Sequence, residues 1–140
     1  VNVTPTQPLS GDWQVRYARF GFTTMEASET SAGFESNYVL DGLKTKIDAS
    51  VGLTLPADFL LDARLSYQDR LGGYVSGETG QEVDYDPFRL VSFTLSRHFA
   101  DDAFRAYLRV DNALDLDYVD LGNVAQPGRW LRLGFAYQMK

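Results

Sequence analysis

The sequence predicts an all-β protein, made of antiparallel strands that belong to a transmembrane β-barrel. Three observations predict this fold class. Apolar and polar residues alternate along most of the 140-residue chain, the connections between alternating segments are short and long in turn, and aromatic residues gather at segment ends. A mean hydropathy of -0.24 agrees with this fold, because one face of every barrel strand is polar.

The clearest alternation runs from 44 to 55. Ile47, Val51 and Leu53 share one face there, while Asp48 takes the other. A period of two predicts a strand with one apolar face. Near Arg19 the alternation of the first segment breaks, which predicts a β-bulge. Together the expected strands lie near residues 12–25, 44–55, 59–70, 88–99, 103–112 and 130–140.

The connections differ strictly in length. Those at 56–58 and 100–102 are tight, whereas those at 26–43, 71–87 and 113–129 are long and rich in Gly, Ser, Asp and Glu. Bacterial outer-membrane barrels have short periplasmic turns and long extracellular loops. A strand of about twelve residues, rising about 3.3 Å each and tilted by about 40°, climbs roughly 30 Å, enough for an apolar band about 25 Å tall. We therefore expect an outer-membrane location with a periplasmic carboxyl terminus.

Aromatic residues fall at both ends of the expected strands. Such residues form girdles at the two membrane interfaces of a barrel. The alternative is that they are ordinary strand aromatics of a soluble sheet. The expected turn-end girdle is Trp13, Phe59, Phe99, Phe104 and Tyr137, and the expected loop-end girdle is Phe22, Tyr67, Phe88 and Trp130.

Charged residues follow the same alternation. Side chains at alternate positions of a strand point to the same face, so each position has either inward or lipid-facing parity. Four arginines have the inward parity and are expected to line a polar lumen that contacts a plug domain: Arg64, Arg70, Arg105 and Arg109. The alternative is solvated charge on an ordinary sheet. Arg97 has the lipid-facing parity, but it lies near the turn end, where the cost of a lipid-facing Arg falls from ~2–4 to about 0–1 kcal/mol.

Composition excludes several classes of protein. The length allows one domain, and the absence of cysteine excludes disulfide scaffolds and Cys-ligated metal sites. With 19 acidic and 13 basic residues the net charge is -6, which argues against nucleic acid as a partner. No apolar run is long enough for a transmembrane helix. Because the chain begins at Val1 without an initiator Met or a signal peptide, we expect a processed protein or a piece of a longer one.

Catalytic and metal-binding motifs are missing from the sequence. It has no Gly-x-Ser-x-Gly element and no phosphate loop. His98 is the only histidine, and we expect a hydrogen-bonded wall residue rather than an acid–base catalyst. Asp115, Asp117 and Asp120 offer oxygen ligands for calcium, but a solvated acidic loop is the favoured interpretation because an EF-hand pattern is absent. We expect neither enzymatic activity nor a metal or cofactor.

The carboxyl-terminal stretch carries the most specific motifs. Residues 109–115 read Arg-Val-Asp-Asn-Ala-Leu-Asp, Tyr118 follows, and Pro127-Gly128-Arg129 precedes an amphipathic segment at 130–140. This resembles the carboxyl-terminal end of TonB-dependent outer-membrane receptors, which carry an Asn-Leu-Phe-Asp-type element, a Tyr, a Pro-Gly-Arg turn and a final strand. Here Ala-Leu replaces the usual Leu-Phe. Residues 36–46 and 67–70 also resemble a cobalamin- and colicin-receptor-like branch abundant in Bacteroidetes, so the resemblance spans nearly the whole chain from about residue 12.

The final segment is also similar to the signal that the barrel-assembly machinery recognises. In that signal a polar residue is followed by Gly two positions on, and then by aromatic or apolar residues three and five positions further. Arg132, Gly134, Tyr137 and Met139 fill these places, although Met replaces the usual terminal Phe. The alternative is an edge strand that happens to alternate.

The resemblance implies that residues 1–140 are about six carboxyl-terminal strands of a roughly 22-stranded transporter. Such receptors import scarce nutrients such as iron chelates, haem or cobalamin. The implied partners are the remaining barrel strands, a plug domain, outer-membrane lipid, the barrel-assembly machinery, TonB acting through the plug, and a surface lipoprotein. Candidate substrate-binding loop aromatics are Phe34, Tyr38, Tyr74 and Tyr85.

Two other classes of protein remain open. One is a small, complete outer-membrane barrel or porin, and the other is a soluble β-barrel, lipocalin-like module or β-sandwich. In the favoured interpretation both edge strands pair with further polypeptide, since unpaired backbone groups are costly in hydrocarbon. Residues 1–4 are then expected to end the strand that precedes residues 12–25.

Overall fold

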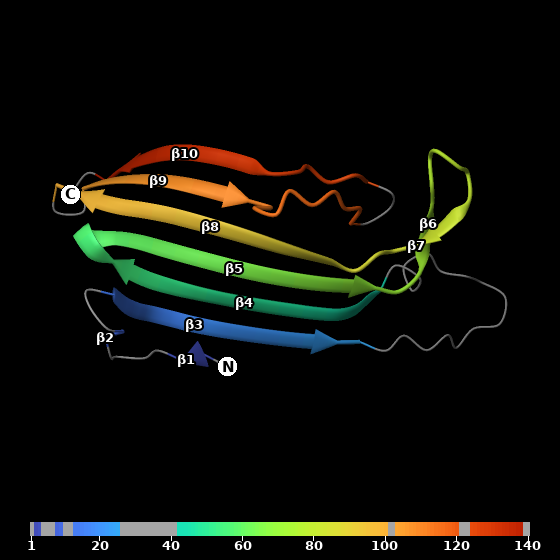
Figure 1. The fold of residues 1–140 in the computed structure, drawn as a ribbon, viewed down its shortest axis with the longest axis horizontal. Coiled ribbons are helices and arrows are strands. Elements are labelled where there is room, and N and C mark those ends of the chain that lie inside the picture. The colour runs from blue at the N-terminus through green and yellow to red at the C-terminus, as the bar shows by residue number, and fades with distance from the viewer. Residues whose placement is uncertain are drawn as a thin grey trace.

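A computed structural model describes residues 2–3, 8–9, 13–25, 42–100, 103–120 and 124–138. Six long antiparallel strands form one sheet (Figure 1). Among the described residues, no helix is long and apolar enough to cross a membrane. The long strands are β3 (Trp13–Thr24), β4 (Leu43–Leu55), β5 (Phe59–Arg70), β8 (Phe88–Phe99), β9 (Phe104–Asp111) and β10 (Trp130–Tyr137).

Shorter elements complete the fold. β1 (Asn2–Val3) and β2 (Pro8–Leu9) both pair with β3, and the 3-10 turn η1 (Pro56–Asp58) joins β4 to β5. β6 (Gly73–Val75) and β7 (Glu82–Asp84) form a separate two-stranded ribbon inside a long connection. All-β architecture and antiparallel pairing are thus confirmed, and the alternation predicted the long strands to within a few residues.

The bulge in the first long strand lies earlier in the chain than the alternation predicts. Val15 is opposite Leu53 and Tyr17 is opposite Gly52, so Arg16 is the extra residue. An extra residue switches the parity of everything after it. The irregular alternation near Arg19 is therefore a consequence of a bulge three residues upstream.

The strands connect alternately at the two ends of the sheet. Figure 1 shows the turn between β4 and β5 at the left end and the β6–β7 ribbon at the right end. The tight turns use left-handed backbone at Ala57, Asp58 and Ala100, which have φ of 59°, 60° and 52°. The predicted alternation of short and long connections is therefore present.

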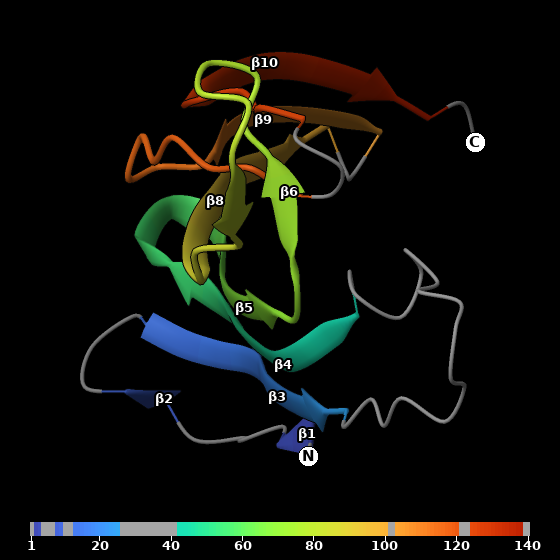
Figure 2. The ribbon, with the colours of Figure 1, turned by 90° about the vertical axis from the view of Figure 1, so that its right-hand side faces the viewer.

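The sheet is an open arc. Its order is β1-β3-β4-β5-β8-β9-β10, with β3 and β10 at opposite ends of the curve (Figure 2). Asn2 lies opposite Arg19, so β1 occupies the outer edge of β3, where the sequence predicts a preceding strand. Within the described residues β10 pairs with β9 alone, and the predicted partner of its outer edge stays a prediction.

Apolar side chains form continuous rows across the outer face. One row crosses five strands from Val51 to Leu131, and the next crosses from Leu53 to Leu133. Leu131 and Leu133 are 69% and 71% exposed. Among the described residues only Tyr85 and Phe88 form a buried apolar core. No second layer therefore covers this face in the described part of the chain.

The aromatic prediction needs one correction. At the turn end, Phe104 lies 6.2 Å from Phe99 and 5.7 Å from Phe135 between ring centroids, so outer-face rings do cluster there. At the loop end, however, Phe88 is opposite Gln68 and buried, and Trp130 is opposite Asp111. Both have the parity of the concave face. These two residues therefore do not belong to the predicted loop-end girdle. The prediction considered only their position along the strand and not the face to which their side chains point.

Candidate functional site

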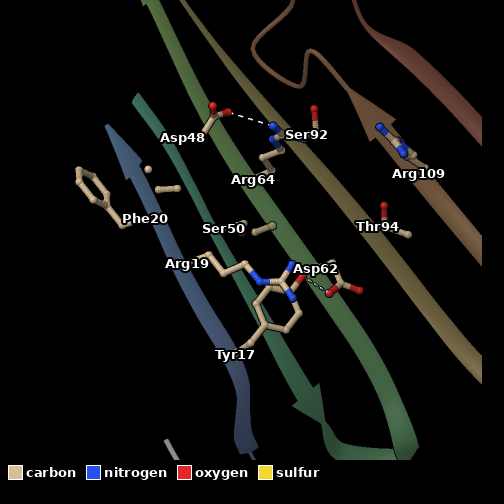
Figure 3. A pocket seen from close by; sticks show the side chains of 13 residues that line it. Tyr17, Arg19, Phe20, Asp48, Ser50, Asp62, Arg64, Ser92, Thr94 and Arg109 are labelled. Carbon is tan, nitrogen blue, oxygen red and sulfur yellow. Dashed lines mark hydrogen bonds and ion pairs between the residues drawn. The ribbon is translucent and has the colours of Figure 1, made fainter. Parts of the chain in front are cut away.

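The concave face of the sheet holds a polar pocket of about 510 Å³. Five strands contribute side chains to it, and Figure 3 shows Phe20 turned away from the group. Because residues of one parity point to the same face, the alternation alone brings these polar groups together. The polar lining is Tyr17, Arg19, Asp48, Ser50, Asp62, Arg64, Ser92, Thr94 and Arg109.

Asp62 is the anchor of one ion-pair cluster. Its Oδ1 lies 2.8 Å from Arg16 Nη2 and accepts a 2.6 Å hydrogen bond from the Tyr17 hydroxyl. The Arg19 guanidinium lies 4.6 Å from the centroid of the Tyr17 ring, a cation–π contact. A Cβ at Gly52 would overlap the Tyr17 ring, so the ring lies flat on the strand only because position 52 is glycine.

A second cluster forms around Asp48. The Arg64 Nη2 donates to Asp48 Oδ1 at 3.0 Å, and Lys46 Nζ lies 3.5 Å from Oδ2. Two cations therefore share one carboxylate. Arg64, one of the predicted lumen residues, lies on the concave face.

The third cluster involves β9 and β10. Arg109 Nε donates to both oxygens of Asp111, at 2.9 and 3.1 Å, and Arg132 Nη2 also donates to this carboxylate. Arg105 Nη2 donates to the Ser96 hydroxyl at 3.3 Å, and its Nε is shielded from solvent without a hydrogen-bond partner among the described residues. The predicted lumen residues Arg105 and Arg109 thus lie on the same face.

Glycine supports this third cluster as well. Tyr107 lies directly opposite Gly134, and a Cβ at that glycine would overlap the Tyr107 ring. The Arg105 guanidinium lies 5.6 Å from the centroid of that ring. Gly134 belongs to the predicted assembly signal, and its structural role is to make room for Tyr107.

Positive charge is in excess on the concave face. Three carboxylates lie on it, those of Asp48, Asp62 and Asp111, against seven cations in the described strands besides Arg70, which pairs with Asp120. The whole chain carries -6, so the acidic residues lie mainly elsewhere. The seven cations are Arg16, Arg19, Lys46, Arg64, Arg105, Arg109 and Arg132.

At the loop end, the motif after β9 is tied to the Pro-Gly-Arg turn. Asn112 is buried with φ of 47°, donates from Nδ2 to the Leu116 carbonyl at 2.8 Å, and accepts from the Leu116 N–H at 3.1 Å. Asp115 Oδ1 accepts from the Arg129 N–H at 2.8 Å and would lie 2.8 Å from a Cβ at Gly128. Hydrogen bonds therefore connect the Asn112–Asp115 motif to the Pro-Gly-Arg turn at the base of the loop.

The described part of that loop folds down over the end of β5. Arg70, which is half-buried, donates to Asp120 Oδ1 from Nη2 at 2.6 Å and from Nε at 3.0 Å. The sequence predicts that Arg70 faces a lumen, and in the structure its charge is paired with the loop. The Tyr118 ring lies 4.5 Å from Phe88 between centroids. Burial raises the pKa of Tyr118 above its ordinary 10.0, and the nearby Asp120 carboxylate adds to this rise.

A second pocket of about 510 Å³ lies beside this loop. The predicted loop aromatic Tyr74 lines it together with Phe88 and Tyr118, whereas Tyr85 is buried behind Tyr74 with 5.3 Å between centroids. The predicted Phe34 and Tyr38 lie outside the described residues, as does Met139 of the assembly signal. The sequence analysis did not predict Phe88 and Tyr118 as pocket residues. The inward parity of Phe88 does, however, indicate that its side chain lies on the concave face.

The remaining expected site residues are also placed. His98 is exposed and opposite Arg105 at the turn end of the concave face. Asp115 lies 3.3 Å from the Arg129 guanidinium, and Asp117 lines the loop pocket. Within the ranges that the structure describes, no group of three or more potential metal ligands occurs.

Arg97 lies on the outer face, as its parity predicts. Its guanidinium is 5.2 Å from the Phe59 centroid and 5.3 Å from the Phe99 centroid. A charged group on an otherwise apolar face is thus stabilised by two rings at the turn end.

Comparisons with known proteins add no identification. No protein-family model, no curated protein and no solved structure matches the chain.

Proposed function

We propose that this chain forms wall strands, extracellular loops and the carboxyl-terminal assembly signal of a TonB-dependent outer-membrane transporter. The substrate class is a scarce nutrient: an iron chelate, haem or cobalamin. One observation carries the proposal. The sheet exposes unbroken apolar rows on one face and ion-pair networks on the other, the division that a wall between lipid and an aqueous lumen requires.

The limits of the apolar face support a bilayer as its surroundings. At the loop end the outer face turns polar at Arg89, opposite Tyr67, and at the ion pair of Lys44 with Asp69, 3.1 Å long. At the turn end the outer face carries Arg97 and, beyond it, the aromatic rings of Phe99 and Phe104. From Ile47 to Leu55 a tilted strand climbs roughly 20 Å, close to the apolar band of about 25 Å in outer-membrane barrels.

The edges of the sheet favour membership in a larger barrel. Unpaired backbone groups cost several kcal/mol each in hydrocarbon, so β10 needs a partner strand there. A transporter of roughly 22 strands supplies it from its first strand. A complete barrel made by these strands alone is disfavoured by the linear order from β1 to β10.

A soluble β-sandwich is disfavoured by the exposed outer face. Sandwich sheets bury one face against a second sheet, and the described residues supply none. Phe20, Phe22, Leu133 and Phe135 are more than half exposed on this face. Contiguous apolar patches beyond a few hundred Å² are rare on monomeric soluble proteins.

β10 fits the proposed role of an assembly signal. Tyr137 is 70% exposed on the outer face, and Gly134 is covered by Tyr107 on the concave face. Within the described residues the strand therefore presents together an apolar side and an edge that pairs with no other strand. The loop pocket beside Tyr74 and Tyr118 is the proposed contribution to nutrient capture, because loops over a rigid scaffold carry most binding sites.

The test is fractionation of cells that make the full-length protein, followed by electrophoresis of the membrane fraction with and without boiling. The proposal predicts outer-membrane recovery and a faster band in unboiled samples, because a folded barrel stays compact in detergent. A soluble, monomeric species in plain buffer would contradict it.

A further inference from the structure

Arg97 of β8 is a cation on the apolar outer face, and its neighbours there are apolar. Phe59 of β5 and Ala106 of β9 lie directly opposite it, and Phe135 of β10 lies opposite Ala106. The Arg97 guanidinium is 5.2 Å from the Phe59 centroid and 5.3 Å from the Phe99 centroid, so two rings flank the charge. The whole row that crosses the sheet at this level is therefore apolar except for Arg97.

No anion in the described part of the chain compensates this charge. Arg97 takes part in no ion pair between described residues. Its Nε is shielded from solvent and has no hydrogen-bond partner among those residues. The flanking rings attract a cation but offer no strong hydrogen-bond acceptor, and a shielded donor without an acceptor is costly. The surroundings of Arg97 therefore lack an anionic acceptor.

The position of Arg97 along the strand matches the headgroup region of a bilayer. Phe93 lies midway between Arg89 and Arg97 on the outer face. Four residues at about 3.3 Å each, on a strand tilted by about 40°, climb roughly 10 Å. Half of an apolar band of about 25 Å is roughly 12 Å, and a long arginine side chain extends its charge toward the interface. If this face contacts lipid, the Arg97 guanidinium reaches the level of the phosphates.

We infer that Arg97 binds the phosphate diester of a phospholipid in the membrane leaflet at the turn end. The inference rests on the proposed function, in which the outer face contacts lipid, and it adds a headgroup site to that contact. A guanidinium presents parallel N–H donors that match two phosphate oxygens. Phe99 and Phe135 are 42% and 64% exposed, so they offer apolar surface to the acyl chains of the same molecule. This combination favours a phospholipid over free phosphate.

Native mass spectrometry of the full-length protein tests this inference. The protein is purified in a non-ionic detergent, which carries no phosphate, and is titrated with phosphatidylglycerol. Arg97→Gln removes the charge and keeps most of the side-chain length, and Arg97→Lys keeps the charge without the parallel donors. Arg89→Gln is the matched control, because Arg89 lies on the same face of the same strand, four residues from Phe93 in the other direction.

The unsubstituted protein and Arg89→Gln are expected to bind phosphatidylglycerol equally. Arg97→Gln is expected to bind it about tenfold more weakly, with Arg97→Lys between them, because a charge-assisted hydrogen-bond pair is lost. A galactosyl diacylglycerol, which has acyl chains but no phosphate, should bind all four proteins alike. Unchanged affinity in Arg97→Gln, an equal loss in Arg89→Gln, or displacement of the lipid by inorganic phosphate would each overturn the inference.

Folding is measured in the same samples by heat-modifiable migration. If the unsubstituted protein lacks that migration, the proposed function fails. If all four proteins migrate as folded barrels and bind phosphatidylglycerol alike, the headgroup site alone fails. Arg97→Lys carries the comparison if Arg97→Gln does not fold.

Discussion

Phe93 lies in the middle of the outer face, between Ala63 of β5 and Val110 of β9. If this face contacts lipid, Phe93→Arg places a guanidinium near the bilayer midplane. The cost there is ~2–4 kcal/mol. Since every 1.4 kcal/mol is tenfold, the equilibrium constant for folding falls by about 30- to 700-fold.

The matched control is Thr94→Arg, one residue further along the same strand. Thr94 lies on the concave face with Asp62 directly opposite on one neighbouring strand and Arg109 on the other, so the same side chain enters a polar site where attraction to the carboxylate offsets repulsion from the guanidinium. We expect the control to change the free energy of unfolding by about 0.5 kcal/mol or less, as surface substitutions do. Val51→Arg, in the same outer row, should behave like Phe93→Arg.

The assay is a reversible denaturant titration of the full-length protein in lipid vesicles. The midpoint of Phe93→Arg should shift to lower denaturant with an unchanged slope. Equal midpoints for Phe93→Arg and Thr94→Arg would refute the assignment of the two faces.

Three further predictions follow from the loops and the glycine contacts. Cysteine at Ser76 should be labelled by an impermeant reagent on intact cells and cysteine at Ala100 should not; the opposite pattern would invert the topology. Gly134→Ala should reduce the yield of folded barrel because its Cβ meets the Tyr107 ring, and Tyr107→Ser should restore the yield; no recovery in the double variant would disprove the steric cause. The neutral Tyr118 phenol is favoured in the folded state, so its stabilising contribution is full below pH 10.0, the unfolded value, and is lost as pH rises through the raised pKa. Proteolysis of the loop should therefore increase above about pH 10, and Tyr118→Phe should remove this increase.

The alternation of residues was sufficient to locate the long strands. A period of two is a local signal, and the same parity correctly predicted that Arg64, Arg105 and Arg109 share one face of the sheet. The short β6–β7 ribbon was not predicted, because three-residue strands leave too few positions for a period to appear among glycines.

Contacts between distant residues could not be read from the same signal. The bulge was predicted three residues too late, since only the pairing of Val15 with Leu53 and of Tyr17 with Gly52 identifies Arg16 as the extra residue. The hydrogen bond from the Arg129 N–H to Asp115 joins residues across a long loop. Likewise, the seating of Tyr107 on Gly134 depends on the register of two strands.

The central claim is that residues of one parity face lipid. Spin labels placed singly at each position from 104 to 111, in the full-length protein in bilayers, test it most directly through collisions with oxygen, which concentrates in lipid, and with a water-soluble nickel chelate. The account predicts high oxygen accessibility at Phe104, Ala106, Leu108 and Val110, and low oxygen accessibility at the positions between them. Accessibility without a period of two, or with the opposite phase, would contradict it.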